Sequence, residues 1–258
     1  MSTDLGDAPI RIVDSSRDAD TGILALDDTI RAAGVLADAT TQALHANPGS
    51  RPLVVGGDCS ILLGIMPAVR RAVGPTGLWF VDGHPDYQDG QSSGTGETAD
   101  MDLALVTGDG PESLVGLAGE VPMVDAASAV LIGHRTEGLD DAATAELARV
   151  PREMAQIPAP VVLQDPAAAG ARAAALLADT GEGSWLHIDL DVLDPRSMPA
   201  VTYPEPAGPD WDQLTQLLLP LARSPRLLGV SVADFRPDLD PQGEYARRVV
   251  DLLGRVLR

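Results

Sequence analysis

The chain has 258 residues, of which 45% are hydrophobic and only 3% aromatic, so its core must consist mainly of aliphatic side chains. Its 38 acidic residues against 18 basic ones give a net charge of −20, which repels phosphate backbones and anionic lipids and argues against nucleic acid and membranes as partners. One cysteine excludes an intramolecular disulfide, and no apolar run is long enough to span a membrane, so we expect a cytoplasmic protein.

Short β-branched runs alternate with Ala- and Leu-rich stretches, which is typical of βαβ units. The expected strands are residues 9–13, 52–55, 78–81, 129–132, 160–163, 184–188 and 227–232. The expected helices are residues 25–46, 60–73, 98–106, 139–149, 167–179, 210–222 and 240–257. With no repeat and no long linker, the pattern predicts one α/β domain over residues 1–258, with three α/β/α layers and a mostly parallel sheet. Ligands of such sheets bind at the carboxyl ends of the strands.

The expected strand 78–81 is followed by Asp82, His84 and Asp86 at alternate positions. In an extended chain these side chains point the same way. Two carboxylates and an imidazole that converge would suit a divalent cation. A polar turn capped by Asp86 is the simpler alternative.

The expected strand 184–188 leads into a second polar pattern, in which His187, Asp189 and Asp191 alternate with apolar residues. Two carboxylates on one side of an apolar strand are costly unless they are paired or bind metal. His187 either orients a ligand carboxylate or is a hydrogen-bonded strand histidine, and the sequence leaves both open.

The expected strand 52–55 precedes a glycine pair and then Asp58, Cys59 and Ser60. The glycines permit a tight strand-to-helix turn, for which Asp58 or Ser60 is a candidate N-cap. At a helix N-terminus Cys59 could be a thiolate that ligates metal or acts as a nucleophile. The alternative is a small buried residue.

In chain order, the segments Gly-Gly-Asp-Cys-Ser, Asp-Gly-His-Pro-Asp and Asp-Leu-Asp-Val-Leu-Asp-Pro resemble the signatures of the arginase/agmatinase/formiminoglutamase (ureohydrolase) family. The family signatures read Gly-Gly-Asp-His-Ser, Asp-Ala-His-x-Asp and Asp-x-Asp-x-x-Asp-Pro, and the match spans residues from about 50 to 240. The resemblance implies an arginase-like fold, a homo-oligomer and a pair of Mn²⁺ ions. The metal ligands that it implies are Cys59, Asp82, His84, Asp86, Asp189 and Asp191.

The chemistry that the resemblance implies is hydrolysis of a linear C–N bond in a guanidino or related small compound, with release of urea or a substituted urea. Two metal ions close together can supply a metal-bound hydroxide near neutral pH. One alternative is a catalytically silent arginase-fold protein with a binding or regulatory role. Another is a cysteine-nucleophile hydrolase, which needs a histidine beside Cys59, and His84 is the candidate.

Cys59 replaces the histidine of the first family signature. Manganese prefers oxygen and imidazole ligands, whereas thiolate favours softer ions, so a single metal ion or Zn²⁺ is an alternative to two Mn²⁺ ions. In this respect the chain is similar to an arginase-like branch of the family, that of hydroxyarginine amidinohydrolases of D-cycloserine biosynthesis.

Further departures affect the catalytic positions. The family loop Gly-Asn-x-His-Gly corresponds to residues 96–100, where Ala99 replaces the histidine proposed to move protons. Glu97 and Asp100 are the remaining candidates for that role. Asp234 stands where the family has a glutamate that contacts the substrate guanidinium.

Other polar residues lie in loops where substrate would enter. His134 and Arg135 either contact an acidic substrate group or are solvated loop residues. Tyr203 and Glu205 either set specificity or only decorate the rim.

Overall fold

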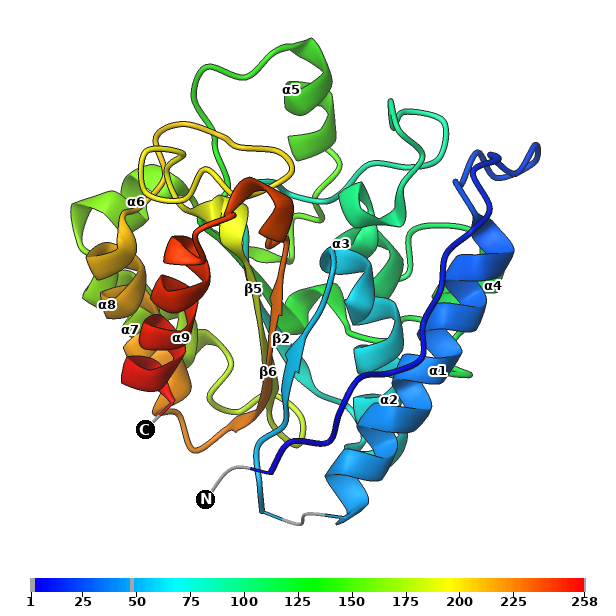
Figure 1. Ribbon diagram of the computed structural model, residues 1–258, viewed down its shortest axis with the longest axis horizontal. Coiled ribbons are helices and arrows are strands. Elements are labelled where there is room, and N and C mark those ends of the chain that lie inside the picture. The colour runs from blue at the N-terminus through cyan, green and yellow to red at the C-terminus, as the bar shows by residue number, and fades with distance from the viewer. Residues whose placement is uncertain (1–2, 47–48, 258) are drawn as a thin grey trace.

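The computed structural model describes residues 3–46 and 49–257 of the chain (Figure 1). Its centre is a sheet of six strands that all run parallel, in the order β1-β6-β5-β2-β3-β4. The strands are β1 (Leu53–Val55), β2 (Gly77–Val81), β3 (Ala129–Ile132), β4 (Ala155–Ile157), β5 (Ser184–Asp189) and β6 (Leu227–Ala233). The expected parallel α/β sheet is thereby confirmed.

Helices cover both faces of this sheet and complete the three layers (Figure 1). One face carries α1 (Leu26–Ala46), α2 (Leu62–Val73), α3 (Asp102–Val106) and α4 (Glu112–Val115). The other carries α6 (Ala159–Gln164), α7 (Pro166–Leu176), α8 (Trp211–Ala222) and α9 (Glu244–Val256), while α5 (Asp141–Leu147) lies beyond one end of the sheet. Within the described ranges, none of these helices is long and apolar enough to cross a membrane.

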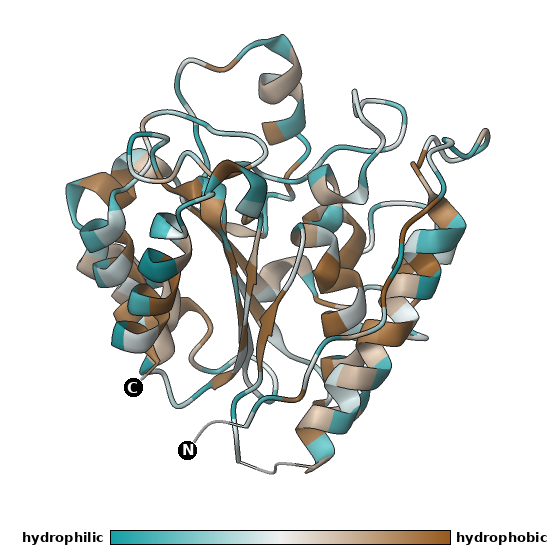
Figure 2. Cartoon of the chain, in the orientation of Figure 1, coloured by the Kyte–Doolittle hydropathy of each residue, from teal (hydrophilic) through white to brown (hydrophobic). Residues whose placement is uncertain are grey.

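The alternation of side chains along β2 explains why the core has two halves. Leu78 and Phe80 pack on the side of α1 and α2, whereas Trp79 and Val81 pack on the side of α7 and α8. All four are fully buried, as expected for a parallel strand covered on both faces. Trp79 also donates its indole N–H to the carbonyl of Ala173 at 2.9 Å. In Figure 2 the strands accordingly form an apolar centre, with hydrophilic residues on the outer helix surfaces.

Two of the expected strands are wrong, and one strand was not expected. Residues 9–13 form no strand: their apolar side chains are exposed, and no strand in the described ranges pairs with them. Residues 160–163 belong to α6, because Pro160 in its first turn fits a helix start, where no backbone N–H is needed. The unexpected strand is β4, whose three residues are too few to give an alternating pattern.

The order of the strands fixes where a ligand can bind. From β2 the chain proceeds outward to β3 and β4, and then returns to β5 and β6 on the other side of β2. Such a reversal opens a crevice at the carboxyl ends of the two central strands. Val81 of β2 is paired with Ile188 of β5, so Asp82 and Asp189 follow side by side at that crevice.

Candidate metal centre

Four neighbouring strands deliver polar side chains to one edge of the sheet. Asp82 follows β2, and Asp189 is the last residue of β5. Asp234 follows β6, and Cys59 begins the 3₁₀ helix η1 (Cys59–Ile61) after β1. Because parallel strands end at the same edge, residues from distant parts of the sequence meet there.

Backbone N–H groups orient the carboxylates at this edge. Asp82 Oδ1 accepts a hydrogen bond from the N–H of His84 at 2.7 Å, and Asp189 Oδ1 accepts one from the N–H of Asp191 at 2.7 Å. Asp191 Oδ1 accepts from the N–H of Gly83 at 3.1 Å. A Cβ on Gly83 would lie 2.9 Å from that same oxygen, so only glycine permits this approach without a shift. One oxygen of each carboxylate is thus fixed, and the other faces neighbouring side chains.

His84 connects the two central strands. Its Nδ1 lies 2.9 Å from Asp191 Oδ2 and 3.8 Å from Asp82 Oδ1, and its Nε2 lies 3.9 Å from Glu205 Oε1. Burial works to lower the pKa of His84, but the charges of Asp191, Glu205 and Asp82 outweigh it and raise the pKa well above its usual value. The side chain is 29% exposed, so solvent reaches the site from this side.

We call Asp82, His84, Asp86, Asp189 and Asp191 the carboxylate cluster. Burial, together with the neighbouring carboxylates, raises the pKa values of Asp82, Asp86 and Asp189 well above the usual range. For Asp191 burial has the same tendency, but His84 reverses it and lowers the pKa. A buried group of acids that cannot all ionise together is what a bound cation would relieve.

The donor atoms of the carboxylate cluster fit a divalent metal. Ligand atoms of Asp82, His84 and Asp191 lie within 4.8 Å of one another, and so do those of Cys59, Asp82 and Asp86. Carboxylate oxygen and imidazole nitrogen are the donors that manganese prefers. These two groups share Asp82 and contain five of the six predicted metal ligands. The sixth, Asp189, contacts Cys59 and so lies next to them.

Cys59 is buried, with 2% of its surface exposed. Its Sγ lies 2.7 Å from Asp189 Oδ2, 3.7 Å from Asp82 Oδ2 and 3.2 Å from His187 Nε2. Burial and then the negative charges of Asp189 and Asp82 raise the pKa of the Cys59 thiol, so the expected low-pKa thiolate is wrong for the protein without a cation. The histidine that contacts Cys59 is His187, whereas His84 contacts Asp191.

Asp234 lies beside the carboxylate cluster. Its carboxylate is within 4.8 Å of those of Asp189 and Asp191, and it accepts two hydrogen bonds from the N–H of Thr202 at 2.8 and 3.1 Å. Burial raises its pKa to about 6. Asp234 and Asp86 both have positive φ, 58° and 46°, a conformation that costs a non-glycine residue about 1 kcal/mol or more. Such strain is common where side chains are held for function.

Glu97 and Asp100 lie in the loop that precedes α3. Asp100 accepts a hydrogen bond from Ser93 Oγ at 2.6 Å, and burial raises its pKa to about 6. Glu97 accepts one from the hydroxyl of Tyr203 at 3.2 Å, which joins two loops at the surface. These hydrogen bonds link the two acids to loop residues and not to the carboxylate cluster.

His134 and Arg135 are not solvated loop residues. Arg135 is 6% exposed, and its guanidinium donates to the backbone carbonyls of Gly133, Val192 and Glu205 at 3.0, 2.9 and 2.7 Å. It therefore ties the loop after β5 to the loop at residue 205. His134 is fully buried, and burial lowers its pKa to about 4.

The sequence reasoning missed two residues near Cys59. Asp102, the first residue of α3, is fully buried and lies next to Cys59 and His187. Ser231 on β6 contacts His187 Nδ1 through its hydroxyl at 2.7 Å. A signal existed for Asp102, because it is an acid placed between Met101 and the apolar run 103–106. No such signal existed for Ser231, because its contact with His187 depends on the register between β5 and β6.

Comparison with known proteins agrees with this geometry. The sequence matches the Arginase family over residues 2–257. An arginase from Brevibacillus brevis is 31% identical over 237 residues, which are 90% of this chain and 76% of the relative. An N(1)-aminopropylagmatine ureohydrolase from Thermus thermophilus is 28% identical over 202 residues, or 78% and 59% of the two chains. The native structure of the Bacillus caldovelox arginase matches with a TM-score of 0.87 and 27% identity, over 98% of this chain and 83% of that one. The chain therefore belongs to the arginase family.

Proposed function

We propose that the protein is a metal-dependent hydrolase that cleaves a linear C–N bond in a small guanidino or related compound and releases urea or a substituted urea. The observation that carries the proposal is the convergence of the carboxylate cluster at the crevice between β2 and β5. Relatives in the family are named as an arginase and as a ureohydrolase of an agmatine derivative, which supports a guanidino substrate.

The ions we propose are two Mn²⁺, held by the carboxylate cluster and Cys59, with one ion or Zn²⁺ as the alternative. Bound divalent ions would supply Lewis-acid activation of the attacking water. The chain's own contribution is to hold its carboxylates in fixed orientations through the N–H groups of Gly83, His84 and Asp191. This pre-organisation avoids rearrangement when the ligand set is used.

Asp234 is the residue we propose to bind the substrate cation. Its carboxylate lies at the edge of the carboxylate cluster, and the N–H of Thr202 fixes its position. A guanidinium group presents planar N–H donors that match a carboxylate. Glu97 and Asp100, in the loop before α3, are the candidates for proton transfer.

The test combines metal content with product detection. Protein purified without chelator, and again after manganese loading, would be analysed for metal per chain and incubated with arginine, agmatine, hydroxyguanidines and formimidoylglutamate. We expect bound metal and release of urea or the corresponding amide from one of these compounds, and loss of both in Asp191→Asn. Asp251→Asn, on the exposed face of α9, is the matched control. Bound metal without any product would favour the silent binding protein, and no metal in either preparation would reject the hydrolase.

A single domain, a homo-oligomer and a cytoplasmic location remain predictions. Light scattering on the purified protein measures the oligomer directly. A single cooperative unfolding transition would support one domain.

A further inference from the structure

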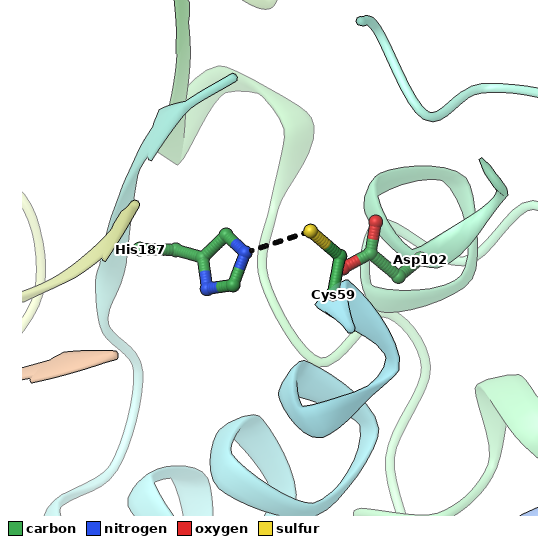
Figure 3. Close-up of side chains that lie close together, drawn as sticks. All are labelled: Cys59, Asp102 and His187. Atoms are coloured by element: carbon green, nitrogen blue, oxygen red, sulfur yellow. Dashed lines mark hydrogen bonds between the residues drawn. The ribbon is translucent and has the colours of Figure 1, made fainter. Parts of the chain in front are cut away.

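Cys59, Asp102 and His187 are three buried side chains of different chemistry that lie close together. Cys59 comes from η1, Asp102 from the start of α3 and His187 from β5, and Figure 3 shows the three side chains close together. Their ligand atoms all lie within 4.8 Å of one another, and Cys59 Sγ is 3.2 Å from His187 Nε2. We call these three residues the cysteine cluster. Their exposed fractions are 2%, 0% and 0%.

Asp102 is the unusual member of the cysteine cluster. Neither of its carboxylate oxygens has a hydrogen-bond partner within the described ranges of the chain. A buried carboxylate without partners costs several kcal/mol, so native structures rarely keep one without a cation or a shared proton. The nearby carboxyl of Asp86 can share a proton with it, and that is the alternative to a cation. An unpartnered acid that lies beside a thiol and an imidazole points to a missing ligand.

The imidazole of His187 is held in one orientation. Its Nδ1 contacts Ser231 Oγ at 2.7 Å, and the same hydroxyl accepts the indole N–H of Trp185 at 2.9 Å. The ring also stacks on Phe80, with centroids 5.2 Å apart. If Nδ1–H donates to Ser231, the lone pair of Nε2 faces Cys59. Metal-binding histidines commonly donate their second ring N–H to such a partner, which fixes the ring and its tautomer.

We propose that Cys59, Asp102 and His187 form a Zn²⁺ site that is distinct from the carboxylate cluster, and Cys59 is the one residue that it shares with the proposed manganese ligands. Thiolate, imidazole and carboxylate are the three ligand types of zinc in proteins, and three protein ligands leave a fourth position open. In a tetrahedral zinc site a sulfur and a nitrogen ligand are roughly 3.6 Å apart, close to the observed 3.2 Å. Asp102 and His187 lie outside the ligand set implied by the family signatures.

The alternative use of the same side chains is a cysteine nucleophile with His187 as its base. That reading leaves Asp102 unpartnered, because the second ring nitrogen of His187 contacts Ser231 and not a carboxylate. The cysteine cluster is also closed to solvent, whereas a nucleophile must reach its substrate. The zinc site uses all three side chains and is therefore the better account.

The experiment measures metal binding and not activity, so its outcome is independent of the proposed hydrolase. Metal-free protein would be titrated with Zn²⁺ and, as a spectroscopic probe, with Co²⁺, in competition with a chelator of known affinity. We expect a thiolate-to-cobalt charge-transfer band that Zn²⁺ abolishes. Since loss of an outer partner costs about 10- to 100-fold in metal affinity, we expect Ser231→Ala to weaken zinc binding within that range. Asp102→Asn and His187→Gln remove ligands, so each should weaken binding by at least about 100-fold.

His45→Gln, at the exposed end of α1, controls for the loss of any one histidine. A cobalt band that survives in both Asp102→Asn and His187→Gln would overturn the proposal, because Cys59 would then bind metal only with the carboxylate cluster. Should a variant not fold, X-ray absorption at the zinc edge of the unmutated protein decides. With one zinc ion per chain, one sulfur and one imidazole ligand support the site, because Cys59 groups with Asp82 and Asp86 but not with His84. Sulfur without imidazole, or an all-oxygen environment, rejects it.

Discussion

The carboxylate cluster and the cysteine cluster adjoin each other at one edge of the sheet, but they are built in opposite ways. In the carboxylate cluster, backbone N–H groups hold Asp82, Asp189 and Asp191, and His84 is partly open to solvent. In the cysteine cluster, Asp102 has no partner among the described residues and nothing is exposed beyond 2%. The carboxylate cluster thus offers oxygen and imidazole donors that solvent can reach, whereas the cysteine cluster is closed to solvent and includes a soft sulfur donor.

This contrast centres on Cys59, which belongs to the cysteine cluster and contacts the carboxylate cluster. Cys59 contacts Asp189 on one side and His187 on the other, so its sulfur belongs to both sets. Thiolate binds softer ions than imidazole does, so a thiolate at residue 59 would favour zinc over manganese. The aspartates that follow β2 and β5 are unaffected, because strand ends and backbone N–H groups position them.

The largest expected effect is that of Asp189→Asn. The change removes a charged ligand from the carboxylate cluster, so product release should fall by at least about 100-fold, as should manganese affinity. In metal-free protein the same change removes a repelling charge, so the free energy of unfolding should rise. Steady-state kinetics and chemical denaturation with and without manganese measure both.

The opposite signs of the two effects separate metal binding from folding. Asp251→Asn, on the exposed face of α9, should alter neither measurement. If Asp189→Asn destabilised the metal-free protein, the aspartate would be a structural acid and the contrast between the two clusters would fail.

Cys59→Ser should have an intermediate effect. The hydroxyl keeps the size of the side chain but is a poor ligand at neutral pH, so we expect about a tenfold loss of activity, equivalent to about 1.4 kcal/mol. Zinc binding should be lost altogether, because the thiolate is the ligand that favours zinc. Complete loss of activity with metal still bound would instead indicate a nucleophile. No change in either property would make Cys59 a bystander.

How far the sequence predicts these two clusters follows from the kind of contact involved. Asp82, His84 and Asp86 alternate after one apolar run, so local spacing is enough to predict that they act together. The contact between His187 and Ser231 depends on which strands are neighbours and in what register, which no local pattern contains. Likewise Asp102 approaches Cys59 only because η1 and α3 are brought together by the packing of helices on the sheet.

The same distinction applies to the fold. The buried strands β2, β3, β5 and β6 were predicted closely, because apolar runs or apolar residues that alternate with polar ones mark them. Residues 160–163 show the same composition but form a helix, since a proline in the first turn matters more there than β-branched side chains. In residues 9–13 the apolar side chains of Ile10, Ile12 and Val13 are exposed, and no strand among the described residues pairs with them.

Asp100 provides a smaller test, because it is a half-buried acid that belongs to neither cluster. Burial raises its pKa to about 6 in the folded protein, above the 3.8 of an unperturbed aspartate. The folded protein therefore holds this proton more tightly than the unfolded chain does. The stability that this contributes is complete below pH 3.8 and is lost as the pH rises through about 6. Asn cannot ionise, so Asp100→Asn should remove this pH dependence. Between pH 4 and pH 7 the free energy of unfolding of the variant should rise by about 1 kcal/mol relative to that of the unmodified protein, after allowance for solvent screening.

Chelator-treated protein is the right material for this measurement, since metal would add its own pH dependence. Denaturation at several pH values gives the difference between the two proteins directly. A difference that stays constant with pH would mean that Asp100 ionises normally despite its partial burial.

The smallest expected effect is that of Tyr203→Phe at the rim of the carboxylate cluster. The hydroxyl of Tyr203 donates to Glu97 at 3.2 Å, but the side chain is 48% exposed. Water can replace the lost hydrogen bond, so we expect stability to change by less than about 0.5 kcal/mol and activity by about twofold.

Glu97→Gln is the informative partner, because it keeps the hydrogen bond and removes only the ionisable group. If Glu97 transfers a proton, kcat should fall in Glu97→Gln and stay nearly unchanged in Tyr203→Phe. Equal small effects in both variants would assign this loop to the rim and leave Asp100 as the remaining acid for proton transfer.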